Sequence, residues 1–185
     1  GLVIDPKSRP KLNVLVNKNV REIDAHGKYL LPGFIDSHTH IHSPDENQQV
    51  SADYIFKLWL GHGVTSTREV FGMTGESRLL ALKELSNKNA ITAPRITAFP
   101  YFAMPVDGGE KLAPINTAND ARERVQYLKR IYADGIKFMG APEEILWAAL
   151  EEAEKLELNT TMHHAQLNVA HANVLDTSSR GLDCM

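Results

Sequence analysis

The sequence has 185 residues and a formal net charge of −3, and 43% of its residues are hydrophobic and 23% charged, a composition typical of globular proteins. No run approaches the roughly 18 apolar residues of a membrane-spanning helix, and no basic stripe with interleaved aromatic residues indicates nucleic-acid binding. The single cysteine, Cys184, excludes an internal disulfide framework. We therefore expect small-molecule or peptide partners, no nucleic acid and no membrane.

Both ends of the sequence are abrupt. The chain begins at Gly1 without a methionine and shows no n-region or h-region of a signal peptide. At the other end, "SSRGLDCM" stops at what reads as the entry to another strand. We expect an N-terminal fragment of a soluble protein, either cytoplasmic or exported with its leader removed.

The chain divides near residue 33. Residues 1–33 read as short extended segments such as "LNVLVN" and "NVREID", separated by the turn-forming "NKN" and "HGK". These segments are too few to bury a sheet of their own. From residue 34 onward, apolar strands alternate with amphipathic helices, which is typical of βα units and a parallel sheet.

This second part, residues 34–185, contains five predicted strands and the start of a sixth. The strands lie at residues 34–40, 64–70, 95–100, 134–140 and 159–165. The first helix carries Ala52, Ile55, Leu58 and Trp59 on one face at helical spacing. A later helix starts at Thr117, with Asp120 at capping-box spacing.

The alternation fits either a doubly wound sheet or a (β/α)8 barrel. No Gly-rich phosphate loop follows the first strand, which disfavours the dinucleotide-binding version of the doubly wound sheet. A complete barrel needs eight strands and roughly 250 residues. The sequence therefore predicts an α/β fold that forms about five to six βα units of a partial barrel.

Three histidines follow the first apolar run at alternate positions, in "GFIDSHTHIH". Alternate residues of a strand share a face, so His38 and His40 lie together at the carboxyl end of the strand. Two imidazoles there can bind a metal ion at about 2.0–2.1 Å. Asp36 lies one layer deeper and can support the site by hydrogen bonding. His42 either faces the site without binding metal or lies outside it.

Lys137 stands in the middle of the short apolar strand "DGIKFMG". Lysine is rarely buried unless its charge is compensated. Alternation directs Ile136 and Phe138 to one face and Lys137 to the other, and burial favours the neutral amine that reacts with carbon dioxide to form a carbamate. The alternative is a lysine that extends to solvent from the strand end or pairs with a carboxylate.

Two adjacent histidines end the fifth predicted strand, in "TTMHHA". Because side chains alternate, only one of His163 and His164 can face the interior of a barrel. Alternation does not choose between them. The other histidine is expected to be partly buried and hydrogen-bonded.

Together these motifs resemble the metal-dependent amidohydrolase superfamily, in its binuclear, carboxylated-lysine branch related to imidazolonepropionase and prolidase-like enzymes. The matching segments are "YLLPGFIDSHTHIH", "GVTSTREVFG", "DGIKFMG" and "MHHA". "IDAHGKYLLPGFID" also resembles the passage from the small β-sandwich domain of the family into its barrel. The resemblance implies that residues 1–33 are a remnant of that small domain and that residues 34–185 are the N-terminal part of the barrel.

The resemblance also implies the site residues. His38 and His40 would bind one metal, Lys137 as its carbamate would bridge two, and His164 would bind the second; His164 is preferred over His163 because Ala165, a small residue, follows it. The two divalent ions are expected to be zinc, and Lys137 acts in catalysis through its carbamate. Glu69 stands where related sequences often have aspartate, and we assign it no role.

The implied activity is hydrolysis of an amide, a peptide or a cyclic amide bond by a metal-activated hydroxide. The family also takes a histidine from the sixth strand and an aspartate from the eighth, and the sequence ends before both. Two alternatives stay open: a mononuclear, deaminase-like member, and a catalytically inactive fragment. The open strand edges of a partial barrel predict self-association or pairing with the missing C-terminal half.

Overall fold

A computed structural model describes residues 24–42, 50–72, 74–103, 115–164 and 172–185. The extended segments predicted before residue 24 lie outside this part, as does most of the long loop after the third strand. Residues 33–185 form one compact unit. None of the described helices is long and apolar enough to cross a bilayer.

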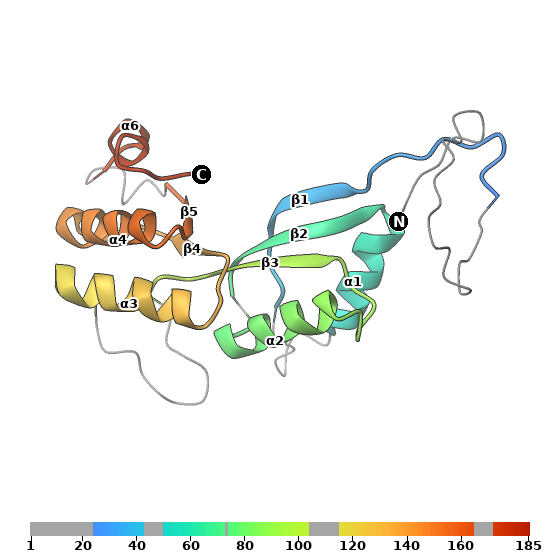
Figure 1. Cartoon of the computed structure of the whole chain (residues 1–185), viewed down its shortest axis with the longest axis horizontal. Helices are drawn as coiled ribbons and strands as arrows, with labels where there is room; N and C mark the ends of the chain where they lie inside the picture. The colour runs from blue at the N-terminus through green and yellow to red at the C-terminus, as the bar shows by residue number, and fades with distance from the viewer. Residues whose placement is uncertain (1–23, 43–49, 73, 104–114, 165–171) are drawn as a thin grey trace, which may run out of the picture. The chain divides into compact units, whose positions relative to one another are not determined.

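Within this unit, strands and helices alternate along the chain (Figure 1). The strands are β1 (Phe34–Thr39), β2 (Val64–Phe71), β3 (Arg95–Pro100), β4 (Gly135–Phe138) and β5 (Asn159–Met162). The helices are α1 (Ala52–Gly61), α2 (Glu76–Asn87), α3 (Ala118–Arg130), α4 (Glu143–Lys155) and α6 (Val174–Ser178). The α/β fold predicted from the sequence is therefore confirmed.

The strands are parallel and follow one another in chain order. One sheet has the order β1-β2-β3 and the other pairs β4 with β5. A bridge between Tyr101 and Lys137, and a 2.8 Å hydrogen bond from the Phe102 N–H to the Lys137 carbonyl, join the two sheets. Cys184 forms a further parallel bridge with Thr161 of β5. Neither sheet closes on itself within the described residues.

Helix α3 illustrates how local sequence sets these elements. The Thr117 hydroxyl accepts a hydrogen bond from the Asp120 N–H, and the Asp120 carboxylate accepts one from the Thr117 N–H. This reciprocal capping box satisfies two donors at the start of the helix, as the sequence predicts. Ala121, Val125 and Leu128 recur on one face and are fully buried, so the helix packs on the strands through that face.

The apolar core has two clusters. One is formed by residues of α3, α4, β4 and β5 together with Phe102, Ala172 and Leu182. The other joins α1 and α2 to β3 and to Ile41, just after β1, and Figure 1 shows both helices on the same side of β1–β3. Phe56, rather than the predicted Leu58, fills this second cluster, because Leu58 is 44% exposed on the other side of α1.

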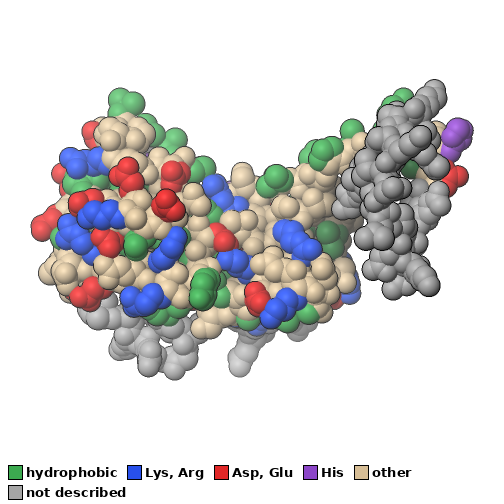
Figure 2. All heavy atoms as spheres, viewed as in Figure 1, with side chains coloured by type: hydrophobic (Ala, Val, Ile, Leu, Met, Phe, Trp, Pro, Cys, Tyr) green, Lys and Arg blue, Asp and Glu red, His purple; other side chains and the backbone are tan. Residues whose placement is uncertain are grey.

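Strand β1 is an exposed edge. Among the described strands it pairs with β2 alone, and Phe34 and Ile35 are 71% and 74% exposed. Figure 2 shows hydrophobic side chains at the surface in several places, whereas Lys, Arg, Asp and Glu side chains are interspersed over α3 and α4. Large apolar side chains on an open strand edge are unfavourable in water.

Candidate functional site

The predicted ligands lie at the carboxyl ends of parallel strands. His38 is near the end of β1 and His40 directly follows it, while Lys137 lies in β4 and the predicted ligand His164 follows β5, next to His163. The carboxyl ends of parallel strands meet at one edge, which is where α/β folds bind ligands. Local strand geometry therefore brings these side chains toward a common edge.

His38 and His40 are neighbours, with ring centroids 5.2 Å apart in an edge-to-face arrangement. The Asp36 carboxylate accepts a 3.1 Å hydrogen bond from the His38 N–H, so it supports this segment through its backbone. Burial lowers the pKa of His38, and the positive charges of Lys137 and Arg68 lower it further.

The environment of His40 also favours the neutral imidazole. Burial lowers the pKa of His40, with smaller contributions in the same direction from His38 and His42. Its Nδ1 atom is buried and has no hydrogen-bond partner among the described residues. A neutral imidazole with a free nitrogen lone pair is the form that binds metal. The ring of His42 lies 6.4 Å from that of His40 and is partly buried.

Lys137 is buried as predicted. Its side chain is 1% exposed, and its Nζ atom has no hydrogen-bond partner in the described part of the chain. Burial lowers the pKa of Lys137, and the nearby Arg68 lowers it further. The side chain therefore does not extend to solvent, and it pairs with no carboxylate among the described residues.

The two histidines after β5 have different surroundings. Lys137 pairs directly with Thr161, and paired residues of neighbouring strands point to the same face. The His163 N–H donates to the Phe138 carbonyl at 2.9 Å and continues the ladder, so His163, two residues after Thr161, shares the face of Lys137. His163 also lowers the pKa of His38, which places its ring near the first histidine pair.

His164, the predicted ligand, is turned toward α6. Its Nε2 atom lies 3.2 Å from the Thr177 hydroxyl, and its buried Nδ1 atom has no partner among the described residues. Burial lowers the pKa of His164, and His163 adds to this effect. The structure thus brings His38 and His40 together and directs Lys137 and His163 to one face of β4 and β5, whereas the His164 ring lies beside the Thr177 hydroxyl of α6.

The chemical types of these side chains suit a divalent metal ion. The set offers the imidazoles of His38 and His40, whose pKa is lowered by burial, and a buried amine that has no hydrogen-bond partner among the described residues. Within the described ranges, no three side chains of the types His, Cys, Asp and Glu form a metal-binding group on their own. A carbamate on Lys137 would add an anionic oxygen ligand that those side-chain types do not provide at this position.

Two charged residues of β2 were not assigned a role from the sequence. Glu69 is fully buried, and burial raises its pKa to about 7. Arg68 donates through Nε to the Ser37 carbonyl at 2.7 Å, and its Nη2 atom lies 3.2 Å from the Cys184 sulfur. A signal was present in "TSTREVF", because two adjacent charges inside a predicted strand point to opposite faces and both must be accommodated.

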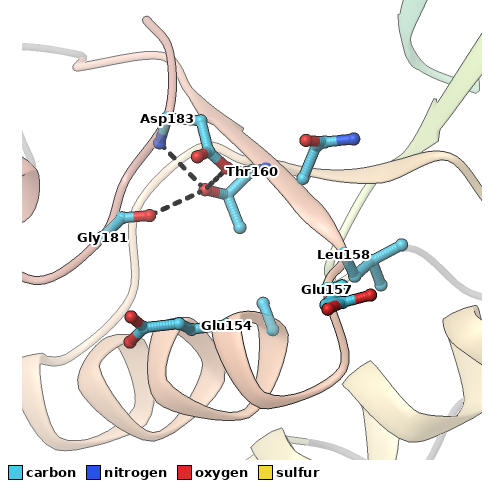
Figure 3. A pocket seen from close by; sticks show the side chains of 8 residues that line it. Glu154, Glu157, Leu158, Thr160, Gly181 and Asp183 are labelled. Atoms are coloured by element: carbon cyan, nitrogen blue, oxygen red, sulfur yellow. Dashed lines mark hydrogen bonds between the residues drawn. The ribbon is translucent and has the colours of Figure 1, made fainter.

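A separate hollow lies at the other end of β5. It is lined by residues that include Glu154, Asn159 and Asp183, and Figure 3 shows the Thr160 hydroxyl hydrogen-bonded to Asp183 and to the Gly181 carbonyl. Asn159 and Thr160 begin the strand, whereas His163 follows its carboxyl end. The hollow is therefore distinct from the histidine and lysine constellation.

The sequence profile of the amidohydrolase family matches residues 29–183. This chain belongs to the amidohydrolase family. The resemblance inferred from the histidine and lysine motifs is thereby confirmed for most of the chain.

Individual relatives extend this finding. Adenine deaminase 2 of Desulfotalea psychrophila is 30% identical over 105 residues, which cover 51% of this chain and 18% of that protein. Two solved structures have a similar fold: a bottromycin amidohydrolase (21% identity, TM-score 0.57) and a Xaa-Pro dipeptidase with bound methionine (18% identity, TM-score 0.55). The matches cover 82% and 89% of this chain, but 31% and 51% of those structures.

Proposed function

We propose that the intact protein containing this chain is a metal-dependent hydrolase that cleaves an amide, a peptide or a cyclic amide bond. The observation that carries the proposal is the buried Nζ atom of Lys137, which has no hydrogen-bond partner among the described residues and whose charge acts on His38. An unpaired buried amine destabilises a fold, so its presence beside two histidines favours a chemical role. Membership of the amidohydrolase family supports this interpretation.

The fold proposed for the intact protein is a (β/α)8 barrel, of which residues 34–185 supply the N-terminal part of about five to six βα units, preceded by a small β-sandwich domain that includes residues 1–33. Five parallel strands in chain order, with Cys184 beside β5 as the start of a sixth, support the barrel. A doubly wound sheet reverses its strand order, and the described strands show no reversal. The open β1 edge would pair with the last barrel strand or, failing that, with another copy.

The proposed site has two divalent ions, with zinc as the first choice because imidazole and carboxylate-like oxygens suit it. His38 and His40 would hold one ion, and the carbamate of Lys137 would bridge both. For the second ion the sequence favours His164, but the register of β5 supports His163, which shares the face of Lys137. We propose His163 as the ligand, with His164 fixed by Thr177.

The residues of this chain prepare the site in three ways. Burial keeps His38 and His40 neutral, because it lowers the pKa of both imidazoles. Burial also favours the neutral amine of Lys137, which adds to carbon dioxide, forms an N–C bond and releases one proton. Bound divalent ions supply a water of lowered pKa and polarise the scissile carbonyl. His42, beside His40, is free to contact the substrate.

A mononuclear deaminase is the second candidate. The 30% identity to an adenine deaminase favours it. In that case one ion is held by histidines, and Lys137 acts without a carbamate. A second metal ion, or a carbamate on Lys137, would exclude this candidate.

The test is hydrolysis by the intact protein of a panel of dipeptides, N-acyl amino acids, cyclic amides and adenine, before and after removal of metal with a chelator. We expect hydrolysis of at least one C–N bond class, loss on chelation and recovery with zinc. Mass spectrometry of the intact protein under native conditions should detect the added mass of a carbamate, about 44 Da, only when Lys137 is present. Chelator-resistant hydrolysis, or activity retained by Lys137→Met, would refute the proposal.

A further inference from the structure

The Glu69 carboxylate connects two backbone segments at the carboxyl ends of β1 and β2. Its Oε1 atom accepts a 3.1 Å hydrogen bond from the Ile41 N–H, and its Oε2 atom accepts a 3.0 Å hydrogen bond from the Gly72 N–H. The side chain is fully buried. Ile41 directly follows His40, so the Glu69 carboxylate binds the backbone of the residue next to the candidate ligand.

The second contact stabilises an unusual bend. Phe71 has φ of 122° and Gly72 has φ of 74°, and a non-glycine residue at such a positive φ is strained and is often found at a functional site. The bend brings the Phe71 ring edge-to-face against the His40 ring, with centroids 6.4 Å apart, and stacks it on Tyr101 at 4.7 Å. The Gly72 N–H reaches Glu69 from within this bend.

The segment that carries His40 is thus fixed on both sides. Before His40, Thr39 pairs with Glu69 in the strand register, and its hydroxyl donates to the Arg68 carbonyl at 3.1 Å. After His40, the Ile41 N–H donates to Glu69. Two backbone anchors and one ring contact therefore restrict the orientation of the His40 imidazole.

From these contacts we infer that Glu69 is a positioning residue, which orients His40 for metal by bridging the backbone of Ile41 and Gly72. The inference rests on the proposed metal-dependent function, and it assigns a role to a residue that is not among the predicted ligands. Burying a carboxylate is unfavourable, and two backbone donors are the compensation that the described residues provide. Replacing a residue that orients a metal ligand without binding the metal itself typically weakens metal affinity about 10-fold to 100-fold.

The experiment measures cobalt(II) binding to the metal-free intact protein and to four variants. Glu69→Gln keeps the size of the side chain, but its NH2 group cannot accept one of the two N–H bonds. Glu69→Asp keeps the carboxylate and shortens its reach. Thr67→Val alters a buried residue of the same strand whose hydroxyl has no hydrogen-bond partner among the described residues. Glu76→Gln alters a buried carboxylate that pairs with Arg124 rather than with backbone near His40. Unfolding curves accompany every variant.

We expect Glu69→Gln to weaken cobalt binding by about 10-fold or more, Glu69→Asp to weaken it less, and both controls to bind as the parent does. In the metal-free protein, the Ile41 and Gly72 amides should exchange with solvent faster in Glu69→Gln. If Glu69→Gln does not fold, the cobalt affinity of Glu69→Asp alone tests the inference.

Parental cobalt affinity in the Glu69 variants, or an equal loss in Glu76→Gln, would overturn the inference while leaving the metal site intact. A parent protein that binds no cobalt, or that binds it unchanged after His38→Asn and His40→Asn, would instead refute the proposed function and this inference with it.

Discussion

Lys137 and Glu69 are both buried ionisable side chains, but their surroundings differ. Glu69 accepts two backbone hydrogen bonds, whereas the Nζ atom of Lys137 has no partner in the described part of the chain. Since a buried polar group without a partner costs about 1–3 kcal/mol, Lys137 weakens the metal-free fold. Stability alone therefore does not account for a lysine at this position.

Replacing Lys137 with methionine separates its chemical role from its structural effect. Lys137→Met removes the unpartnered amine at similar length, so we expect the metal-free protein to be more stable by about 1–3 kcal/mol in urea unfolding. The same variant should lose the bridged metal ion and the hydrolytic activity. Lys57→Met, on the exposed surface of α1, serves as the control and should change neither property. A less stable Lys137→Met protein with full metal content would contradict this account.

Glu69 should make stability depend on pH. Its pKa is raised from 4.5 to about 7 in the folded protein, so the fold favours the protonated acid. The stabilisation is fully present below pH 4.5 and is lost as pH rises through about 7, with a total near 3 kcal/mol. Unfolding of the metal-free parent and of Glu69→Gln from pH 4 to pH 8 measures it. The parent should lose stability relative to the variant across this window, and parallel curves would contradict the prediction.

At the scale of elements, a buried ion pair connects α2 to α3. The Arg124 Nη2 atom lies 2.6 Å from the Glu76 carboxylate, and the guanidinium also donates to the Phe102 and Tyr101 carbonyls. Both side chains are nearly inaccessible to solvent. This pair connects the start of α2 to α3 and to the residues that follow β3.

Breaking this pair should be costly. We expect Arg124→Met to destabilise the protein by about 3–5 kcal/mol, because it leaves the Glu76 carboxylate buried without its partner. The double variant with Glu76→Leu should regain much of that loss. Lys57→Ala, which breaks the exposed Lys57–Asp53 pair, should cost less than about 1 kcal/mol. Similar unfolding free energies for Arg124→Met and Lys57→Ala would show that the buried pair contributes little.

The sequence predicted the alternation of strands and helices and the capping box of α3, because both depend on residues that are near in the chain. It did not predict that Phe56 rather than Leu58 fills the core, since α1 carries apolar residues on more than one side and its partner decides which side is buried. The choice between His163 and His164 has the same origin. It depends on the register of β5 against β4, which is a tertiary property.

The buried charges were only partly predictable. Lys137 was found because a single cation interrupts a short apolar strand. Glu69 was noted in the sequence but given no role, because its partners are backbone N–H groups that carry no mark in the sequence. The Arg124–Glu76 pair joins residues 48 positions apart, and a single sequence gives no indication of such a contact.

At the scale of the whole molecule, β1 forms an open edge among the described strands. It has one neighbour among the described strands and exposes Phe34 and Ile35. We expect the 185-residue chain alone to associate in light scattering, and Ile35→Lys to reduce that association, because charge on an edge strand opposes pairing. Leu175→Lys, at an exposed leucine of α6, should have no effect. A monodisperse monomer would contradict the expectation.

The most direct test of the account is the metal content of the intact protein, measured beside a His38→Asn/His40→Asn double variant with the same fold by circular dichroism. The account predicts about two divalent ions per chain in the parent, as two-metal hydrolytic sites hold, and a clear loss in the double variant. A parent without bound divalent metal, or a double variant with unchanged metal content, would contradict the assignment of His38 and His40 as ligands.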